Sequence, residues 1–541
     1  MSFSFVDRKI NLQKLKSETF DLVIIGGGIN GAGMARDAAL RGMRVALVEA
    51  NDFASGTSSR SSKLIHGGIR YLENLEFHLV FEALNERQKL FEMAPHLVHP
   101  LRFMIPLYKS SRVSPLMMGL GMWLYDALSL FQAPEMHEHL DYQETTRRMP
   151  VLKSEGLKGS FVYSDAYMDD DRLTIETLRS AHRAGAVIVN YCTATGAETK
   201  DGAVVGIKVK DQFSKDAFSI FGKHVVSTVG PWTDELGHQF FKEWKNVLRP
   251  TKGVHLTFEK KRFPLSSAVV MGAEKRIVFG IPRHEMVIVG TTDTDFKGSP
   301  SDVTTDVEDV RYLLGVVHDY FPGVKITKED IVASYAGVRP LVHDGSETEG
   351  KTSREHTIWT DEHRVSFVAG GKYTTYRLIA EQAVNHCLRH FRLEDRARFL
   401  RSQTATALNP LVTTESFSMK DFLLEQIRAS SQLSPDESLH LGERHGQEAI
   451  ELIKKYGNKT SYVELEALHA IENTMCTSVV DFYTRRSPLV LSKMDHGLSY
   501  LDQVAQIFAR EMDWSEDQTR LEKEKVLAHI DRELGWQKLK F

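Results

Sequence analysis

Residues 20–49 read FDLVIIGGGINGAGMARDAALRGMRVALVE, and this stretch decides the fold. Its first six residues form a run rich in β-branched side chains, which predicts a buried parallel strand. A glycine-rich turn follows directly, and residues 32–40 then have the pattern of a helix. Residues 44–48 predict a second strand that ends at an acidic residue. The stretch therefore predicts the strand–turn–helix–strand unit of a Rossmann-like α/β domain.

The glycines of the turn have the spacing G-x-G-x-x-G, at Gly26, Gly28 and Gly31. The first allows a tight turn, the second lets the backbone approach a pyrophosphate, and the third lets helix and strand pack closely. Ile29 and Asn30 complete the turn at the start of the helix, whose free N–H groups favour phosphate. Glu49 stands where a carboxylate would accept hydrogen bonds from ribose hydroxyls. The pattern predicts a dinucleotide site rather than a ligand-free glycine turn, and it does not by itself choose between NAD and FAD.

The composition is typical of a globular protein with two or three domains. The chain has 541 residues, of which 42% are hydrophobic and 26% charged, and a formal net charge of −4. Without a basic surplus we expect no nucleic-acid partner. The three widely spaced cysteines predict no metal site and favour a reducing, cytoplasmic compartment. A polar N-terminus and the lack of a long uncharged apolar stretch predict neither a signal peptide nor a transmembrane helix.

The next segment, residues 52–72, reads DFASGTSSRSSKLIHGGIRYL. Its serine-rich part could be a flexible linker. Because it directly follows the strand that ends at Glu49, it could instead line the phosphates and ring of a cofactor, with close backbone approach at the paired glycines. Arg70 and Tyr71 are candidate contacts for an anion and a hydroxyl. The candidate cofactor contacts in this segment are Thr57, Ser58, Ser59, Ser62, Lys63, Leu64, His66, Gly67 and Gly68.

Residues 26–73, GGGINGAGMARDAALRGMRVALVEANDFASGTSSRSSKLIHGGIRYLE, resemble the N-terminal signature of FAD-dependent glycerol-3-phosphate dehydrogenases, the respiratory enzymes. The resemblance extends to about Met512 through YAGVRPL at 335–341, VSFVAGGKYTTYR at 365–377 and DFYTRR at 481–486. At 225–233 this chain has VVSTVGPWT where the family has N-A-T before G-P-W. The resemblance implies FAD as the cofactor and adds Gly230, Trp232, Gly371, Lys372 and Thr374 to its contacts.

Two of these segments also suggest chemistry of their own. Arg339, between a glycine and a proline, suits bidentate recognition of a phosphate or hydroxyl, although it could be a surface arginine in a turn. The double glycine before Lys372 begins a helix, whose positive end would stabilise a reduced flavin. A positive charge on Lys372 would serve the flavin or a substrate phosphate.

The rest of the chain predicts two further domains. Short strands at 254–258, 276–281 and 286–290, with a helix capped by Thr305 and Glu308, suggest an antiparallel substrate domain. The residues after Pro410 have helical patterns. We therefore expect an amino-acid-oxidase-like two-domain plan with an all-helical C-terminal domain. The expected divisions are an N-terminal extension at 1–19, an FAD-binding domain at 20–110 with 165–240 and 335–392, a substrate-binding domain at 111–164 with 241–334, and a helical domain at 400–541.

Residues 115–131, PLMMGLGMWLYDALSLF, are the most apolar window of the chain. At this length the window is too short for a convincing membrane span. It could form a buried helix pair, or a surface that dips into the bilayer interface. We leave both interpretations open at this stage and favour the buried pair.

The resemblance implies oxidation of sn-glycerol 3-phosphate to dihydroxyacetone phosphate by hydride transfer to flavin N5, with a membrane quinone as electron acceptor. Arg70, Tyr71, Arg339 and Lys372 would bind the substrate, and Arg339, His66 and His255 are the candidate catalytic residues. The protein would lie peripherally on the cytoplasmic face of the membrane, and the sequence leaves room for a homodimer. The alternatives are a glycerophosphate oxidase that uses O2, an amine or amino-acid oxidase, and a flavin-binding protein without catalysis.

Overall fold

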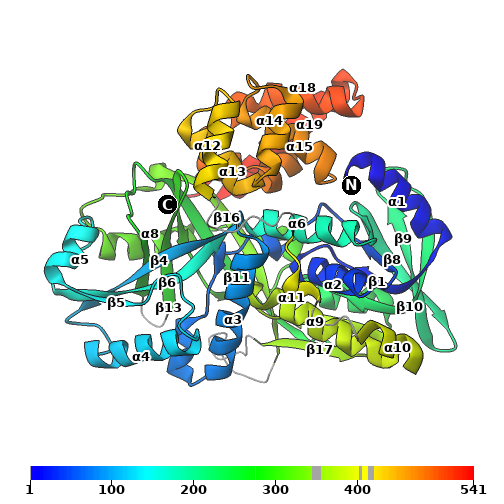
Figure 1. Cartoon of the computed structure of the whole chain (residues 1–541), viewed down its shortest axis with the longest axis horizontal. Helices are drawn as coiled ribbons and strands as arrows, with labels where there is room; N and C mark the ends of the chain where they lie inside the picture. The colour runs from blue at the N-terminus through cyan, green and yellow to red at the C-terminus, as the bar shows by residue number, and fades with distance from the viewer. Residues whose placement is uncertain (1, 274–275, 344–354, 401–404, 412–419, 541) are drawn as a thin grey trace.

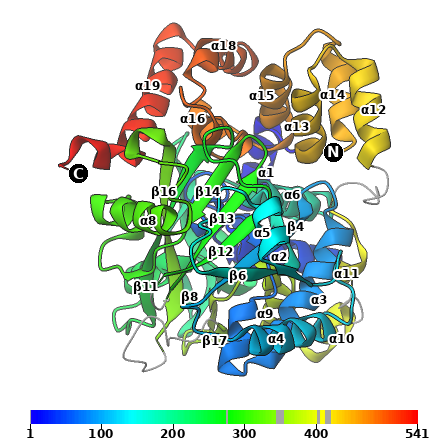
Figure 2. The same cartoon turned by 90° about the vertical axis from the view of Figure 1, so that its left-hand side faces the viewer.

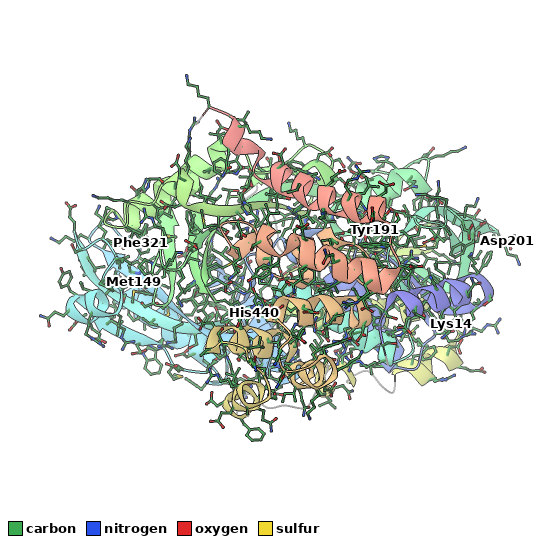
Figure 3. The ribbon with its side chains drawn as sticks, turned by 90° about the horizontal axis from the view of Figure 1, so that it is seen from above. Lys14, Met149, Tyr191, Asp201, Phe321 and His440 are labelled. Atoms are coloured by element: carbon green, nitrogen blue, oxygen red, sulfur yellow. The ribbon has the colours of Figure 1, made fainter. Side chains whose placement is uncertain are left out.

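A computed structural model describes residues 2–273, 276–343, 355–400, 405–411 and 420–540. Two β-sheets lie next to each other, and a layer of helices from the C-terminal part of the chain covers them (Figure 1). Seen from above, these helices extend across both halves of the molecule (Figure 3). The expected plan of two sheet domains with a helical C-terminal part is confirmed.

The first sheet contains the unit predicted from residues 20–49. Its strands, in spatial order, are β17 (His356–Thr360), β18 (Val365–Gly370), β10 (Ala217–Ser227), β1 (Thr19–Ile25), β2 (Val45–Val48) and β7 (Val187–Val189). The strands from β18 to β7 pair in parallel. Strands β8 (Cys192–Lys200) and β9 (Ala203–Asp211) extend β10 as an antiparallel hairpin.

Both faces of β1 are covered, which explains its nearly continuous apolar sequence. One face packs against the helices α2 (Ile29–Leu40), α6 (Asp170–Arg183) and α9 (Tyr376–Cys387). The other packs against the β8–β9 hairpin and α1 (Phe5–Ser17). The sequence of β1 therefore lacks the alternation of apolar and polar residues expected of a strand with one solvent-exposed face.

The second sheet is mostly antiparallel. Its strands are β15 (Thr294–Asp295), β11 (Leu248–Glu259), β14 (Met286–Gly290), β13 (Arg276–Arg283), β12 (Ala268–Ala273), β4 (Val98–Tyr108), β6 (Leu157–Met168) and β3 (Leu64–Ile65), with β16 (Ile331–Val342) beside β11 and β5 (Glu138–Asp141) beside β6. The three strands predicted between 254 and 290 are confirmed as parts of β11, β13 and β14. Helix α8 (Val307–Tyr320) packs on one face.

Two details of this region differ from the predictions. Helix α8 is capped by Asp306 with Asp309 rather than by Thr305 with Glu308, because the first helical residue is Val307. Strand β4 and the part of β16 from Tyr335 onward belong to the second sheet, whereas the expected division grouped these residues with the FAD-binding part. Backbone pairing with β6 and β11, which lie far away in sequence, decides this membership.

The apolar window at 115–131 forms one helix, α4 (Pro115–Leu128), which lies beside α3 (Phe77–Met93) at the end of the molecule opposite the C-terminal helices (Figures 1 and 2). Only Met122, Tyr125 and Asp126 of this helix are buried. The expected buried helix pair is therefore wrong. Only one face of this helix, formed by residues three to four positions apart, packs against the rest of the protein. Among the described residues, no helix has the length and apolarity needed to cross a membrane.

The C-terminal helices share a core of their own. They are α12 (Lys420–Ser430), α13 (Pro435–His445), α14 (Glu448–Tyr456), α15 (Tyr462–Asn473), α16 (Val479–Asp481), α17 (Leu489–Ser492), α18 (Leu501–Met512) and α19 (Glu516–Glu533). Ser434 caps α13 in a capping box with Glu437. Short helices α10 (Leu393–Leu400) and α11 (Ala405–Leu408) connect this layer to the first sheet.

Candidate active site

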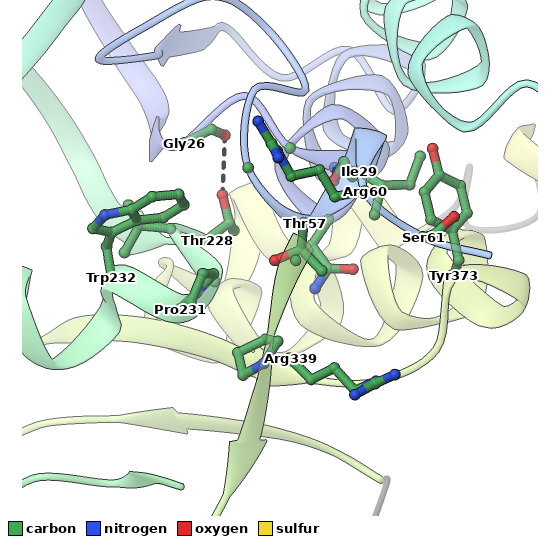
Figure 4. A pocket seen from close by; sticks show the side chains of 18 of the residues that line it. Gly26, Ile29, Thr57, Arg60, Ser61, Thr228, Pro231, Trp232, Arg339 and Tyr373 are labelled. Carbon is green, nitrogen blue, oxygen red and sulfur yellow. Dashed lines mark hydrogen bonds between the residues drawn. The ribbon is translucent and has the colours of Figure 1, made fainter. Parts of the chain in front are cut away.

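A cavity of about 500 Å³ runs from the glycine turn after β1 to the second sheet (Figure 4). Its walls combine segments that lie far apart in the sequence. The residues predicted for the site that line it are Gly26, Gly28, Ile29, Asn30, Glu49, Thr57, Ser58, Ser62, Leu64, His66, Tyr71, Gly230, Trp232, His255, Arg339, Gly371, Lys372 and Thr374. Tertiary structure thus brings most of the predicted site residues to one cavity.

The geometry of the glycine turn leaves no room for larger side chains. A Cβ atom on Gly31 would lie 2.0 Å from the carbonyl oxygen of Gly26. Gly26 has φ +107°, in the region that favours glycine, and its carbonyl oxygen accepts a hydrogen bond from Thr228 Oγ1 at 3.1 Å (Figure 4). The N–H of Ile29, at the start of α2, donates to Ser58 Oγ at 2.9 Å. This cradle at a helix N-terminus fits the pyrophosphate of FAD.

Glu49 lies at the end of β2 and belongs to both the turn and the cavity wall. Its Oε2 accepts a hydrogen bond from the N–H of Gly27 at 2.7 Å, and its Oε1 accepts from Asn51 at 2.8 Å. Burial raises the pKa of Glu49, while the two backbone donors favour its ionised form. The backbone thus fixes the carboxylate where a ribose would lie.

The serine-rich segment is ordered by specific contacts, so the flexible-linker interpretation is wrong. Thr57 Oγ1 donates to the carbonyl oxygen of Val338 at 2.6 Å, which joins the segment to β16. Ser61 Oγ donates to Asp170 Oδ2 at 2.7 Å. These partners are more than a hundred residues away in sequence, and composition alone does not reveal them.

Arg339 on β16 and Lys372 after β18 are two of the cationic side chains that line the cavity. Arg339 Nη1 lies 3.0 Å from Asp293 Oδ1, and its Nη2 donates to Thr291 Oγ1 at 3.0 Å. Lys372 Nζ lies 3.7 Å from the centroid of the Tyr71 ring, a cation–π contact. A Cβ on Gly253 would lie 2.4 Å from Arg339 Nη2, so this glycine makes the room that the guanidinium occupies. The guanidinium is therefore oriented before any ligand arrives.

His255 is a buried, neutral histidine in the cavity wall. Its Nε2 lies 2.8 Å from Ser62 Oγ, and its ring stacks on Tyr335 with centroids 4.8 Å apart. Burial and the nearby charge of Arg339 lower the pKa of His255 to about 3. Its imidazole therefore keeps an unprotonated nitrogen at neutral pH. The other candidate, His66, lines the cavity next to Thr374, whose Oγ1 accepts from its N–H at 3.1 Å.

Some predicted contacts lie elsewhere. Arg70 is exposed and does not line the cavity. The Lys63 side chain points away from the cavity into a buried ion pair with Asp170, because the residue has φ +55°. Gly31, Ser59, Gly67 and Gly68 support the wall without lining it. The N–H of Gly67 donates to the hydroxyl of Tyr125, at 3.0 Å.

Sequence reasoning missed other residues of the site. Arg60 and Thr228 line the cavity, and Asp293 orients Arg339. Arg60 lies inside the serine-rich segment whose neighbouring residues were predicted to contact the cofactor, so its position in the sequence indicated a role in the site. Asp293 follows a strand end after two threonines, and nothing local to it indicates a partner 46 residues away.

Comparisons with known proteins identify the family and the cofactor. Residues 21–377 match the family model of FAD dependent oxidoreductases, and residues 405–519 match the C-terminal domain of alpha-glycerophosphate oxidase. The fold, the cavity and the first match define an FAD-dependent oxidoreductase. The aerobic glycerol-3-phosphate dehydrogenase of Staphylococcus saprophyticus is 36% identical, over 94% of each chain, and that of Staphylococcus aureus is 34% identical over 97% of each. The chain therefore belongs to the aerobic glycerol-3-phosphate dehydrogenase family.

Solved structures extend the comparison. The glycerol-3-phosphate dehydrogenase of Bacillus halodurans, complexed with FAD, has a TM-score of 0.77 and 28% identity, over 98% of each chain. The L-alpha-glycerophosphate oxidase of Mycoplasma pneumoniae has 18% identity and a TM-score of 0.54, and the match covers 68% of this chain and 94% of the oxidase chain. At that identity the second likeness concerns the fold alone. FAD is the cofactor of this chain.

Proposed function

We propose that the protein oxidises sn-glycerol 3-phosphate to dihydroxyacetone phosphate and passes the electrons to a membrane quinone. The observation that carries the proposal is that Arg339 and Lys372 both line the cavity that also contains the dinucleotide turn. Two fixed cations suit a dianionic phosphate. Bound FAD would supply the hydride acceptor, at flavin N5.

The side chains around the substrate would divide the remaining work. Arg339 and Lys372 would bind the phosphate and the oxygen that becomes negative as the hydroxyl loses its proton. His255, with Ser62 as its hydrogen-bond partner, and His66 are the candidate acceptors of that proton. The lowered pKa of His255 makes it a weak base until negative charge develops beside it. Tyr71 would fix Lys372 through its ring. The hydrogen on C2 would leave as hydride, so proton and hydride depart to different acceptors.

The main alternative acceptor is O2. The C-terminal match is named after an oxidase, so this part of the chain does not favour a quinone over oxygen. The curated relatives that cover nearly the whole chain are named dehydrogenases, which favours the quinone. An amine or amino-acid oxidase shares the fold, as glycine oxidase of Geobacillus kaustophilus does at 18% identity. The carboxylate of an amino acid carries less negative charge than the dianionic phosphate of glycerol 3-phosphate, so it would give less reason for two cations in the cavity wall.

We expect glycerol 3-phosphate to bleach the visible flavin absorbance of the purified protein under anaerobic conditions, and a water-soluble quinone to restore it. In air, hydrogen peroxide should form much more slowly than quinone is reduced. Stopped-flow absorbance and a peroxide assay measure the two rates. Peroxide formation as fast as quinone reduction would support the oxidase, and bleaching by a D-amino acid but not by glycerol 3-phosphate would reject the substrate.

Helix α4 supports a peripheral position on a membrane, in whose bilayer the quinone would be dissolved. Its apolar face consists of side chains that are 38–77% exposed, namely Leu116, Met117, Leu120, Trp123 and Leu124. Its only charged residue, Asp126, is buried. Exposed Lys109 and Arg112 precede it. Arg112 forms an ion pair with Glu73, so Lys109 is the cation that suits anionic lipid. Large apolar side chains beside cations are typical of helices that lie in the bilayer interface.

The double variant Leu120→Glu with Trp123→Glu should therefore lose binding to phosphatidylglycerol-containing vesicles by more than about a hundredfold, since each side chain would contribute roughly 1.5–3 kcal/mol when buried in lipid. Cosedimentation of the holoenzyme with vesicles measures this binding. The matched control is Leu521→Glu with Leu527→Glu, which places the same two charges on exposed leucines of α19. Equal binding by the double variant and wild type would show that α4 does not contact lipid.

A further inference from the structure

The C-terminal helices hold the loop that lines the FAD cavity at two points, one near each end of the loop. The first point is Asp52, a buried carboxylate just beyond Glu49. Arg485 Nε and Arg486 Nη1 each donate to Asp52 Oδ2 at 2.6 Å, and Arg486 Nη2 donates to Oδ1 at 2.8 Å. Both arginines follow α16 in the C-terminal layer. Asp52 is thus paired with two charges from a region more than 430 residues away.

The second point is Arg60, whose Nη2 lies 2.7 Å from Glu533 Oε1 at the end of α19. The same arginine donates through Nη1 to the carbonyl oxygen of Ala336 at 3.1 Å. Glu533 is itself fixed to β16, because its carbonyl oxygen accepts from Ser334 Oγ at 2.7 Å. The α19 end therefore joins the loop and the sheet.

Between the two points lie the loop residues that face the cavity, from Ser55 to Ser58. Ser58 accepts the hydrogen bond from Ile29 at the start of α2, and Gly56 packs against Trp232. The C-terminal layer also reaches the neighbouring turn, where Tyr191 donates to Asp481 Oδ2 at 2.6 Å (the position of Tyr191 is labelled in Figure 3). The next residue, Cys192, donates its N–H to the carbonyl oxygen of Glu49 at 2.8 Å.

We propose that the C-terminal helical layer acts as a clasp for FAD: it keeps the loop 52–60 in its cavity-lining conformation through Asp52 and Glu533. These two are positioning residues, because they act through the loop. The start of the loop is packed, since Phe53 and Ala54 are buried, whereas residues 55–60 carry no apolar side chain. Segments with few apolar contacts open locally at low cost, and charge-assisted bonds to a rigid layer raise that cost. Loosening the clasp should therefore speed the release of FAD. This role requires the cofactor alone and is independent of the substrate and the electron acceptor.

The test compares FAD release from three full-length holoenzyme variants, Asp52→Asn, Glu533→Gln and Glu448→Gln. The third is a matched control, because Glu448 also joins the C-terminal layer to the FAD-binding part through a buried arginine, with Arg179 Nη2 2.6 Å from its Oε1, but contacts α6 rather than the loop. After dilution into FAD-free buffer, the rise in free-flavin fluorescence gives the dissociation rate. We expect Asp52→Asn and Glu533→Gln to accelerate release by about tenfold or more, and Glu448→Gln to leave it near wild type.

Two further measurements separate this role from general stability. Amide hydrogen exchange in residues 53–60 should rise in the first two variants and stay unchanged in the control. Arg486→Lys keeps the charge at Asp52 but loses the bidentate contact, so its release rate should lie between those of wild type and Asp52→Asn. If Asp52→Asn does not fold, Glu533→Gln carries the test, since Arg60 and Glu533 pair at the edge of the cavity. Wild-type release by the folded loop variants, or equal acceleration by Glu448→Gln, would overturn the clasp.

Discussion

Arg339→Ala is expected to lower kcat/KM for glycerol 3-phosphate by about a hundred- to a thousandfold. The guanidinium lies in the cavity wall, oriented by Asp293 and Thr291, so its removal takes away a charge that needs no reorganisation to meet the substrate. Truncation also leaves Asp293 without this cationic partner close to a dianionic phosphate. Steady-state kinetics with an excess of quinone measures the loss.

Arg339→Lys is the informative comparison for this prediction. Lysine keeps the charge but has no planar fork, so it should recover only part of the activity. The ratio of flavin to protein, read from the visible spectrum, should be the same in all three proteins, because Arg339 belongs to the second sheet. An alanine variant with most of the wild-type kcat/KM would remove Arg339 from the substrate site.

Gly31→Ala is expected to yield protein with almost no bound FAD. Its Cβ would lie 2.0 Å from the carbonyl oxygen of Gly26 and 2.7 Å from Thr228 Oγ1. The first atom belongs to the glycine turn and the second to the residue that follows β10, so α2 must move away from both. The amides that would face the pyrophosphate move with it. A clash with backbone at this distance costs more than about 3 kcal/mol, which corresponds to over a hundredfold in affinity.

The matched control for this prediction is Gly315→Ala in α8, where a Cβ would meet no atom within 4 Å. It should bind FAD normally and gain about 0.5–1 kcal/mol of stability, because alanine is the better helix former. The flavin-to-protein ratio and the thermal unfolding midpoint are the two measurements. A fully flavinated Gly31→Ala protein with a normal midpoint would contradict the packing argument.

The sequence could predict much of the candidate site because its strongest signals are local. The glycine spacing, the flanking strands and Glu49 lie within one stretch of 30 residues, and backbone sterics alone require them there. The double glycine before Lys372 is a similar local signal. Such segments predict their own conformation, and nearly all of them line the cavity.

Predictions failed where a side chain had two physically reasonable directions. A lysine in this segment could bind a phosphate. Lys63 has a positive φ, however, and its side chain forms an ion pair with Asp170 rather than lining the cavity. Arg70 follows the paired glycines as expected but remains exposed. The apolar window at 115–131 is equally compatible with burial and with exposure, because periodicity does not say what covers a helical face.

By itself, the sequence determined the dinucleotide turn, the antiparallel strands between 254 and 290 and the helical character of the C-terminal part. These features follow from local sterics and from periodicity, which act over a few residues. Only the tertiary structure decided that Asp293 orients Arg339, that α4 presents an apolar face, and that Asp52 and Glu533 bind the cavity loop to the C-terminal helices. The physical reason is that these contacts join residues from about fifty to more than four hundred positions apart, and the packing of whole sheets and helices sets their distances.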